Sequence, residues 1–175
     1  MLILQVGIFI VLAGITYQDF RYRGIYWWMF PILFILLVLN TLHASSVELM
    51  LSSALSSCFF LGIQLVLLMA YLSLKRGRIV NIFSGFFGLG DLLFLLTITV
   101  VFSFLNYLMF YMISLLIVIL LSSFSVGKLQ GKGYKIPLAG YQAIFLSILM
   151  MLQWQFPRIY LHADEFLNNL LVYGN

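Results

Sequence analysis

Apolar runs of membrane-spanning length, separated by short polar segments, make up most of the chain. These runs cover residues 2–17, 25–42, 49–74, 79–124 and 137–156. A helix needs about 20 apolar residues to cross a bilayer, so the run of about 46 residues over 79–124 is long enough for two crossings. We place the turn between those two crossings near residues 103–106. The pattern therefore predicts an all-α integral membrane protein with six transmembrane helices.

The composition indicates that lipid is the solvent for most of the surface. Hydrophobic residues make up 64% of the 175 residues and charged residues only 8%, whereas soluble domains have about 45–50% and about 25%. This balance excludes a cytosolic enzyme, a secreted domain and a disordered chain. We expect one membrane domain over residues 1–175, with no soluble domain. The single cysteine, Cys58, excludes a disulfide framework and a multi-cysteine zinc site.

The distribution of basic residues predicts the orientation of the six spans. The loops after the first, third and fifth spans lie on one face and carry all but one of the nine basic residues. These residues are Arg21, Arg23, Lys75, Arg76, Arg78, Lys128, Lys132 and Lys135. Because basic loops stay in the cytoplasm, this face is predicted to be cytoplasmic and the N-terminus to lie outside. The net charge of +4 then reflects contact with anionic lipid, and no nucleic-acid partner is expected.

Two acidic residues lie next to or inside apolar runs, and both belong to the basic face. Asp19 lies at the inner end of the first span, and Asp91 lies in the stretch that re-enters from the same side. The other acidic residues, in polar loop or tail, are Glu48, Asp164 and Glu165. An ionisable residue at membrane depth costs several kcal/mol and typically marks function. We therefore expect Asp19 and Asp91 to meet on the cytoplasmic side of one helix bundle.

The depth of Asp91 depends on the segment before it. If residues 79–90 form a continuous helix, Asp91 lies about 18 Å from Arg78, near the middle of the membrane. If the glycines of this segment interrupt the helix, an interfacial or re-entrant segment brings Asp91 closer to the surface. Those glycines cost helix stability and allow an extended backbone beside the aspartate, as peptide binding requires. Gly88 and Gly90 are therefore candidate substrate-binding residues.

Two carboxylates in one dry site point to acid–base chemistry. Because both cannot ionise cheaply, one keeps its proton and the other acts as a base. Aspartic peptidases use such a pair to activate water against a peptide carbonyl. Two structural alternatives stay open at this point. Asp19 can pair with Arg21 or Arg23 as an anchor at the end of the span, and Asp91 can hydrogen-bond to a neighbouring helix as a packing device.

Three motifs resemble those of the type IV prepilin peptidases and the related preflagellin peptidases. Gly88-Leu89-Gly90-Asp91 matches the GxGD signature of membrane-embedded aspartic peptidases. The segment from Asp19 to Ile25 looks like the family's first catalytic aspartate and its approach to the second span. Residues 135–140, KIPLAG, are similar to the motif that opens the family's last span. The resemblance covers all six predicted spans and implies that Asp19 and Asp91 are the catalytic pair.

The chain also departs from the usual family pattern. Ile25 is followed by Tyr26 and Trp27, where family members usually have a Pro-Asn pair. Leu93 stands where many members have lysine. The cytoplasmic insertion with paired cysteines, which accompanies N-methylation in bifunctional members, is missing. The chain therefore resembles a short, peptidase-only type.

The resemblance implies an endopeptidase of the prokaryotic cytoplasmic (inner) membrane, with its active site facing the cytoplasm. The implied protein partner is a pilin-like precursor, with a basic leader followed by an apolar helix that lies in the bilayer. The dyad would activate water directly, so neither a cofactor nor a metal is expected. The two histidines, His43 and His162, fall on the opposite side, and no metal-ligand spacing links them to aspartate or cysteine.

Two other classes of membrane protein compete with the peptidase. A transporter or proton-conducting protein also needs carboxylates inside the membrane, but it needs polar groups at several depths, and the second, third and fifth predicted spans contain no acid or base. In a non-catalytic assembly subunit, Asp91 would serve only helix packing. The sequence leaves the oligomeric state open.

Overall fold

The computed structural model describes residues 2–79, 82, 87–126, 137–156 and 161–162. Within these residues the chain is helical and contains no strand. The helices are α1 (Leu2–Tyr22), α2 (Met29–Leu42), α3 (Val47–Arg76), α4 (Leu89–Ile98), α5 (Phe104–Val126) and α6 (Leu138–Gln155). The all-α class is therefore confirmed for the described part of the chain. The predicted loop over residues 127–135 and most of the C-terminal tail lie outside it.

Three of the helices are long and apolar enough to cross a bilayer. They are α1, α3 and residues 104–121 of α5, which is compatible with an integral membrane protein. The helices α2 and α4 are apolar but shorter than a full span, with 14 and 10 residues. The crossing of the membrane by all six helices therefore stays a prediction, as does the orientation.

The helix ends differ from the apolar runs at several places. Helix α1 continues to Tyr22, so Asp19 lies within the helix rather than after it. The chain leaves α1 through Arg23, whose φ of 54° is left-handed, and the backbone N–H of Tyr26 donates to Gln18 Oε1 at 3.0 Å. The turn between α4 and α5 covers residues 99–103 rather than 103–106.

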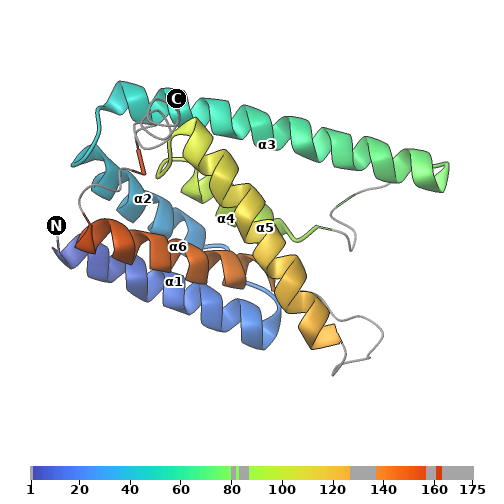
Figure 1. Ribbon diagram of the computed structural model, residues 1–175, viewed down its shortest axis with the longest axis horizontal. Helices are drawn as coiled ribbons and strands as arrows, with labels where there is room; N and C mark the ends of the chain where they lie inside the picture. The colour runs from blue at the N-terminus through green and yellow to red at the C-terminus, as the bar shows by residue number, and fades with distance from the viewer. Residues whose placement is uncertain (1, 80–81, 83–86, 127–136, 157–160, 163–175) are drawn as a thin grey trace, which may run out of the picture.

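The helices α1, α2 and α6 form one side of a bundle. Helix α1 packs most extensively against α6 and then α2, and α4 packs against both α2 and α6. Figure 1 shows α1 and α6 side by side, α5 crossing the bundle obliquely, and α3 lying along the opposite edge and projecting beyond it. Because α1 and α6 are adjacent and antiparallel (Figure 1), the C-terminal end of α1 lies beside the N-terminal end of α6.

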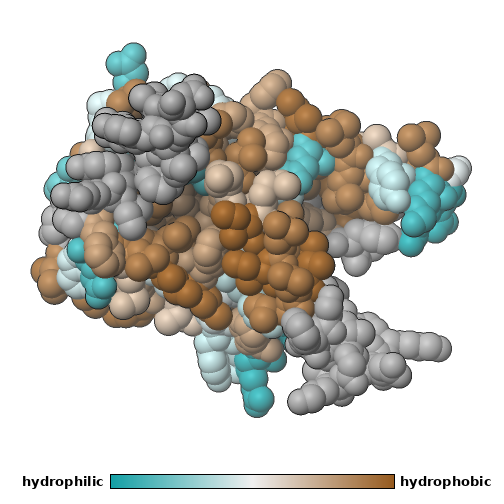
Figure 2. All heavy atoms as spheres, in the orientation of Figure 1, coloured by the Kyte–Doolittle hydropathy of each residue, from teal (hydrophilic) through white to brown (hydrophobic). Residues whose placement is uncertain are grey.

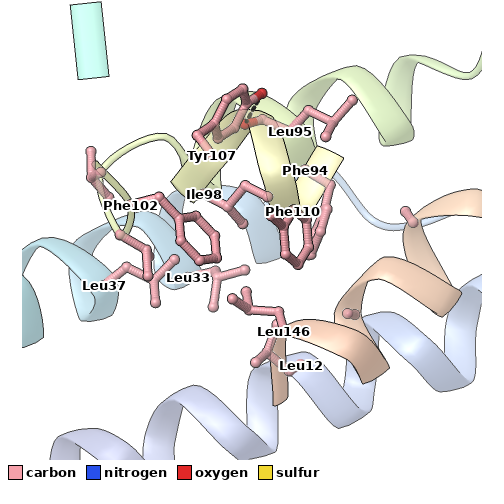
Figure 3. Packing of buried hydrophobic residues seen from close by; sticks show 14 of the residues in the cluster. Leu12, Leu33, Leu37, Phe94, Leu95, Ile98, Phe102, Tyr107, Phe110 and Leu146 are labelled. Carbon is pink, nitrogen blue, oxygen red and sulfur yellow. Dashed lines mark hydrogen bonds between the residues drawn. The ribbon is translucent and has the colours of Figure 1, made fainter. Parts of the chain in front are cut away.

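The core is built from residues of several helices that meet at one level of the bundle. Leu12 of α1, Leu33 of α2 and Leu146 of α6 are fully buried against Ile98 and Phe110 (Figure 3). Figure 2 shows that apolar side chains also cover much of the visible outer surface, as lipid contact requires. In lipid the hydrophobic effect does not drive helices together, so close packing of this kind and interhelical hydrogen bonds hold the bundle.

Hydrogen bonds between side chains tie α5 to its neighbours within this apolar interior. The Gln64 amide donates to the Tyr111 hydroxyl at 2.5 Å and links α3 to α5. The Gln142 amide donates to Ser114 Oγ at 3.1 Å and links α6 to α5. Such bonds in a low-dielectric interior contribute to helix association by about 0.6 kcal/mol each on average.

Candidate active site

Asp19 faces the interior of the bundle because it continues the buried face of α1. The buried residues of that helix are Ile8, Leu12, Ile15 and Asp19, and their spacing of three and four residues places them on one face. Asp19 is only 7% exposed. The packing of α1 on α6 therefore directs this carboxylate toward the start of α6.

Asp91 lies in the first turn of α4. Gly88 precedes the helix in an extended conformation, with φ −76° and ψ 135°, and accepts the Leu92 backbone N–H at 3.1 Å. The helix begins at Leu89, so Asp91 lies close to its N-terminal end. A negative group is favoured there by the unpaired amides and the dipole of the helix. The carboxylate is half-buried.

The two aspartates meet at the N-terminus of α6. The Ala139 backbone N–H donates to Asp91 Oδ1 at 2.9 Å, and the Gly140 backbone N–H donates to Asp19 Oδ2 at 2.6 Å. Consecutive amide nitrogens in a helix are about 3 Å apart, which limits the separation of the two accepting oxygens to about 8 Å. The convergence expected from the sequence is therefore present in the structure, and it uses helix amides that otherwise lack intrahelical partners.

A glycine at position 140 allows α1 and α6 to approach this closely. A Cβ atom at that position would lie 2.8 Å from Cε2 of Phe20 and 3.1 Å from Asp19 Oδ2. The Phe20 ring also packs edge-on against Tyr141, with ring centres 4.8 Å apart. Any side chain at position 140 would therefore displace the ring, the carboxylate or both.

The two candidate substrate-binding glycines have different surroundings. A Cβ atom at Gly88 would lie 2.5 Å from Asp91 Oδ2, so glycine leaves the space that this carboxylate occupies. A Cβ atom at Gly90 would meet Ile25 at 3.6 Å and Phe30 at 3.9 Å, which is ordinary contact with the start of α2. Gly88 is exposed and Gly90 is half-buried. The role of either glycine in substrate binding stays a prediction.

Arg23 adds a positive charge near the pair. It is close enough to Asp19 to interact with its carboxylate electrostatically, and its own backbone N–H donates to the Asp19 carbonyl at 3.1 Å. This electrostatic interaction adds to the hydrogen bond that Asp19 accepts from Gly140, and an anchoring ion pair stays a prediction. Arg21 lies in the last turn of α1 and is exposed. Asp19 thus bonds to α6 through its carboxylate and to the turn after α1 through its backbone carbonyl.

Sequence reasoning missed the amides of Ala139 and Gly140 as the groups that hold the two carboxylates. Only the likeness of residues 135–140 to a family motif drew attention to this segment, and Lys135 itself lies outside the described residues. Among the described residues, no group of three or more His, Cys, Asp or Glu could hold a metal ion.

Comparison of the chain with family models, curated proteins and solved structures gives no match.

We expect a short crosslinker to join positions 19 and 91. The test replaces Asp19 and Asp91 with cysteine in a Cys58→Ala background and treats membranes with a bis-maleimide that spans less than 10 Å, because the accepting oxygens are within about 8 Å. Peptide mass spectrometry measures the yield of the intramolecular product. The control pairs position 91 with Ile8→Cys, on the same face of α1 but about 16 Å farther along it. Equal yields from both pairs would contradict the arrangement.

Proposed function

We propose that this protein is a membrane-embedded aspartic endopeptidase similar to the short, peptidase-only type IV prepilin peptidases. One observation carries the proposal: the carboxylates of Asp19 and Asp91 are bound by consecutive amides at the start of α6. The motif resemblance at residues 19–25, 88–91 and 135–140 gives the same pairing of acids. The α6 amides fix each acid relative to the other, as a two-carboxylate mechanism requires.

The proposed reaction is hydrolysis of a peptide bond by water held between the two acids. One aspartate is ionised and takes a proton from the water as its oxygen attacks the scissile carbonyl. The other begins protonated and donates its proton to the developing oxyanion. The tetrahedral intermediate then collapses, the C–N bond breaks, and the amine leaves with a proton from the dyad. Asp19 Oδ1 and Asp91 Oδ2 take no part in the bonds to Ala139 and Gly140, so they are the oxygens we assign to the water, although Asp91 Oδ2 also lies against the Gly88 backbone.

We propose that the site faces the cytoplasm and that all six helices cross or enter the membrane. The last turns of α1 and α3 carry Arg21, Lys75 and Arg76, and both helices end on the side of the bundle where α6 begins (Figure 1). Basic residues on one side favour the cytoplasmic face. Tyr26 and Trp27, which are 62% and 73% exposed beside the same end, suit the interfacial aromatic belt of a bilayer.

The proposed substrate is a pilin-like precursor with a short basic leader and an apolar helix. The apolar helix would lie in the bilayer, so its junction with the leader falls at the inner boundary of the membrane. In the proposed orientation Asp19 lies near the inner end of α1 and Asp91 near the start of α4, which places both carboxylates at that boundary. Cleavage at the junction then needs no unfolding of the apolar helix.

Co-expression with a pilin-like precursor tests this function. We expect a shorter precursor product in membranes that contain the protein, with a new N-terminus at the junction between leader and apolar helix. Gel mobility and N-terminal sequencing measure the product, and a leaderless form of the same precursor provides the size standard. Unchanged precursors across a panel of leader sequences would contradict the proposal, and a transporter or an assembly subunit predicts that result.

A further inference from the structure

A second candidate site lies at the end of the bundle remote from the aspartates. It is a cavity of about 210 Å³ between α1, α2 and α6, far larger than one water molecule needs. The N-terminal end of α1 and the C-terminal end of α6 lie together at this end of the bundle (Figure 1). Along α1, the cavity residue Gln5 is about 21 Å from Asp19. We call this space the distal cavity.

Amide side chains from three helices line the distal cavity. They are Gln5 of α1, Asn40 of α2 and Gln153 of α6, and each is half-buried. None of these three side chains makes a hydrogen bond to another residue within the described part of the chain. Amides supply both donors and acceptors, so three of them around one cavity offer hydrogen bonds in both directions to a polar occupant.

His162 also lines this cavity, and the residue before it is bonded to the start of α5. The Leu161 carbonyl accepts the Ser103 backbone N–H at 2.9 Å and the Asn106 side-chain amide at 3.0 Å, and Leu161 is buried. The backbone of Val101 is close enough to interact with the His162 ring, but neither buried ring nitrogen makes a well-formed hydrogen bond within the described residues. A buried polar atom without a partner is costly, so a ligand that reached it would be stabilised.

The charge of the lining indicates an uncharged ligand. Among the described residues, those that line the cavity include no Lys, Arg, Asp or Glu. Burial lowers the pKa of His162 from its usual value, so the imidazole is neutral at pH 7. Pockets that select anionic headgroups contain basic residues, and the described part of this lining has none. Hydroxyl groups match a set of neutral amides and an imidazole, because a hydroxyl both donates and accepts.

The depth and the apolar wall indicate where the ligand comes from. Asn40 and Gln153 lie within the last turns of α2 and α6, and Gln5 lies in the first turn of α1. In the proposed topology this end of the bundle lies at the membrane–water interface on the side away from the cytoplasm, where headgroups and aromatic side chains gather. Trp154, half-exposed beside Gln153, gives the cavity an apolar wall suited to the carbon face of a sugar or glycerol group.

We propose that the distal cavity binds an uncharged polyhydroxyl group, such as the sugar headgroup of a neutral glycolipid or a free sugar. The three amides would hydrogen-bond the hydroxyl groups, and the Trp154 ring would pack against the carbon face. The binding site is separate from the aspartate pair, so it does not depend on the proposed peptidase activity.

Histidine NMR on the full chain in nanodiscs tests the proposal. The protein contains two histidines, and His43, an exposed residue just after α2, serves as the internal reference, with assignments from His43→Gln. In phosphatidylcholine nanodiscs with increasing glucosyl-diacylglycerol, we expect a saturable shift of the His162 ring signals and none for His43. Free glucose added to phosphatidylcholine nanodiscs distinguishes a soluble sugar from a lipid headgroup. Nanodiscs with phosphatidic acid test an anionic headgroup that lacks the hydroxyl groups of the sugar.

Matched glutamine variants locate the binding. We expect Gln153→Leu combined with Asn40→Leu to weaken the binding of glucosyl-diacylglycerol by about tenfold or more. Gln155→Leu, an exposed glutamine one residue beyond Trp154 on the same helix, should leave the affinity unchanged, and thermal unfolding checks that each variant is folded. A shift with either sugar probe supports the proposal. The proposal is overturned if neither probe moves the His162 signals, if phosphatidic acid alone moves them, or if the double variant binds like the wild type.

Discussion

We expect Asp19→Asn and Asp91→Asn each to lower the rate of leader cleavage by at least about 10²–10⁴-fold, the usual contribution of a general acid or base. Asparagine has the same shape as aspartate, and its carbonyl oxygen still accepts the hydrogen bond from Gly140 or Ala139. The amide does not take a proton from water, and it does not carry the proton that the oxyanion needs. The structure at the start of α6 should therefore persist while the chemistry is lost. Cleavage of a co-expressed precursor in membranes, followed over time, measures the rate.

A third acid gives the matched control for these two variants. Glu48 lies in the first turn of α3 and is exposed, away from the start of α6. Glu48→Gln makes the same change of carboxylate to amide, and we expect it to leave the cleavage rate within about twofold of the wild type. Membrane fractionation and thermal unfolding show whether the three variants are inserted and folded alike. A folded Asp19→Asn or Asp91→Asn variant that cleaves at the wild-type rate would refute the dyad.

The sequence predicts the helices well because their apolar runs are long and their boundaries are polar. The last predicted span, residues 137–156, agrees closely with α6 (Leu138–Gln155). Helix α2 begins at Met29, four residues after the predicted start, because the chain first leaves α1 in the left-handed conformation of Arg23. Local backbone geometry of this kind is not visible in a hydrophobicity pattern, since the pattern reports burial and not dihedral angles.

The conformation of the backbone just before Asp91 required the structure. The sequence allowed a continuous helix from residue 79 or an interruption by glycines. The structure begins α4 at Leu89, with Gly88 extended before it, so the interrupted form is the observed one. Each alternative satisfies the apolar composition equally, because glycine is compatible with both a membrane helix and a break in it. In the observed form Asp91 accepts a hydrogen bond from Ala139, far along the chain.

The sequence predicts the two acids of the candidate site but not the groups that bind them. The predicted topology alone places Asp19 and Asp91 on the same side of the bundle. The partners that fix them are backbone amides of Ala139 and Gly140, and every residue except proline has a backbone amide, so no residue type marks these two. The transmembrane helices are hydrophobic around most of their circumference, so periodicity also says little about which face of α6 meets α1.

We expect Gly140→Ala to reduce leader cleavage by up to about 10²-fold, the effect of displacing a reacting group by about 1 Å. The added Cβ atom would lie 2.8 Å from the Phe20 ring and 3.1 Å from Asp19 Oδ2. The ring is 38% exposed and can turn outward, but the carboxylate is buried between α1 and α6 and must move away from the Gly140 N–H. We also expect a loss of about 1–3 kcal/mol in the free energy of unfolding from overpacking.

Gly62→Ala is the matched control, because a Cβ atom at Gly62 of α3 would meet nothing within 4 Å. Alanine there should keep full cleavage and increase helix stability by up to about 1 kcal/mol. A second variant distinguishes the effect of the Phe20 ring from the effect of the Asp19 carboxylate. Phe20→Leu added to Gly140→Ala removes the 2.8 Å contact but not the 3.1 Å contact with Asp19, so it should restore stability more than cleavage. If the double variant recovers the wild-type cleavage rate, the ring and not the carboxylate is what Gly140 accommodates.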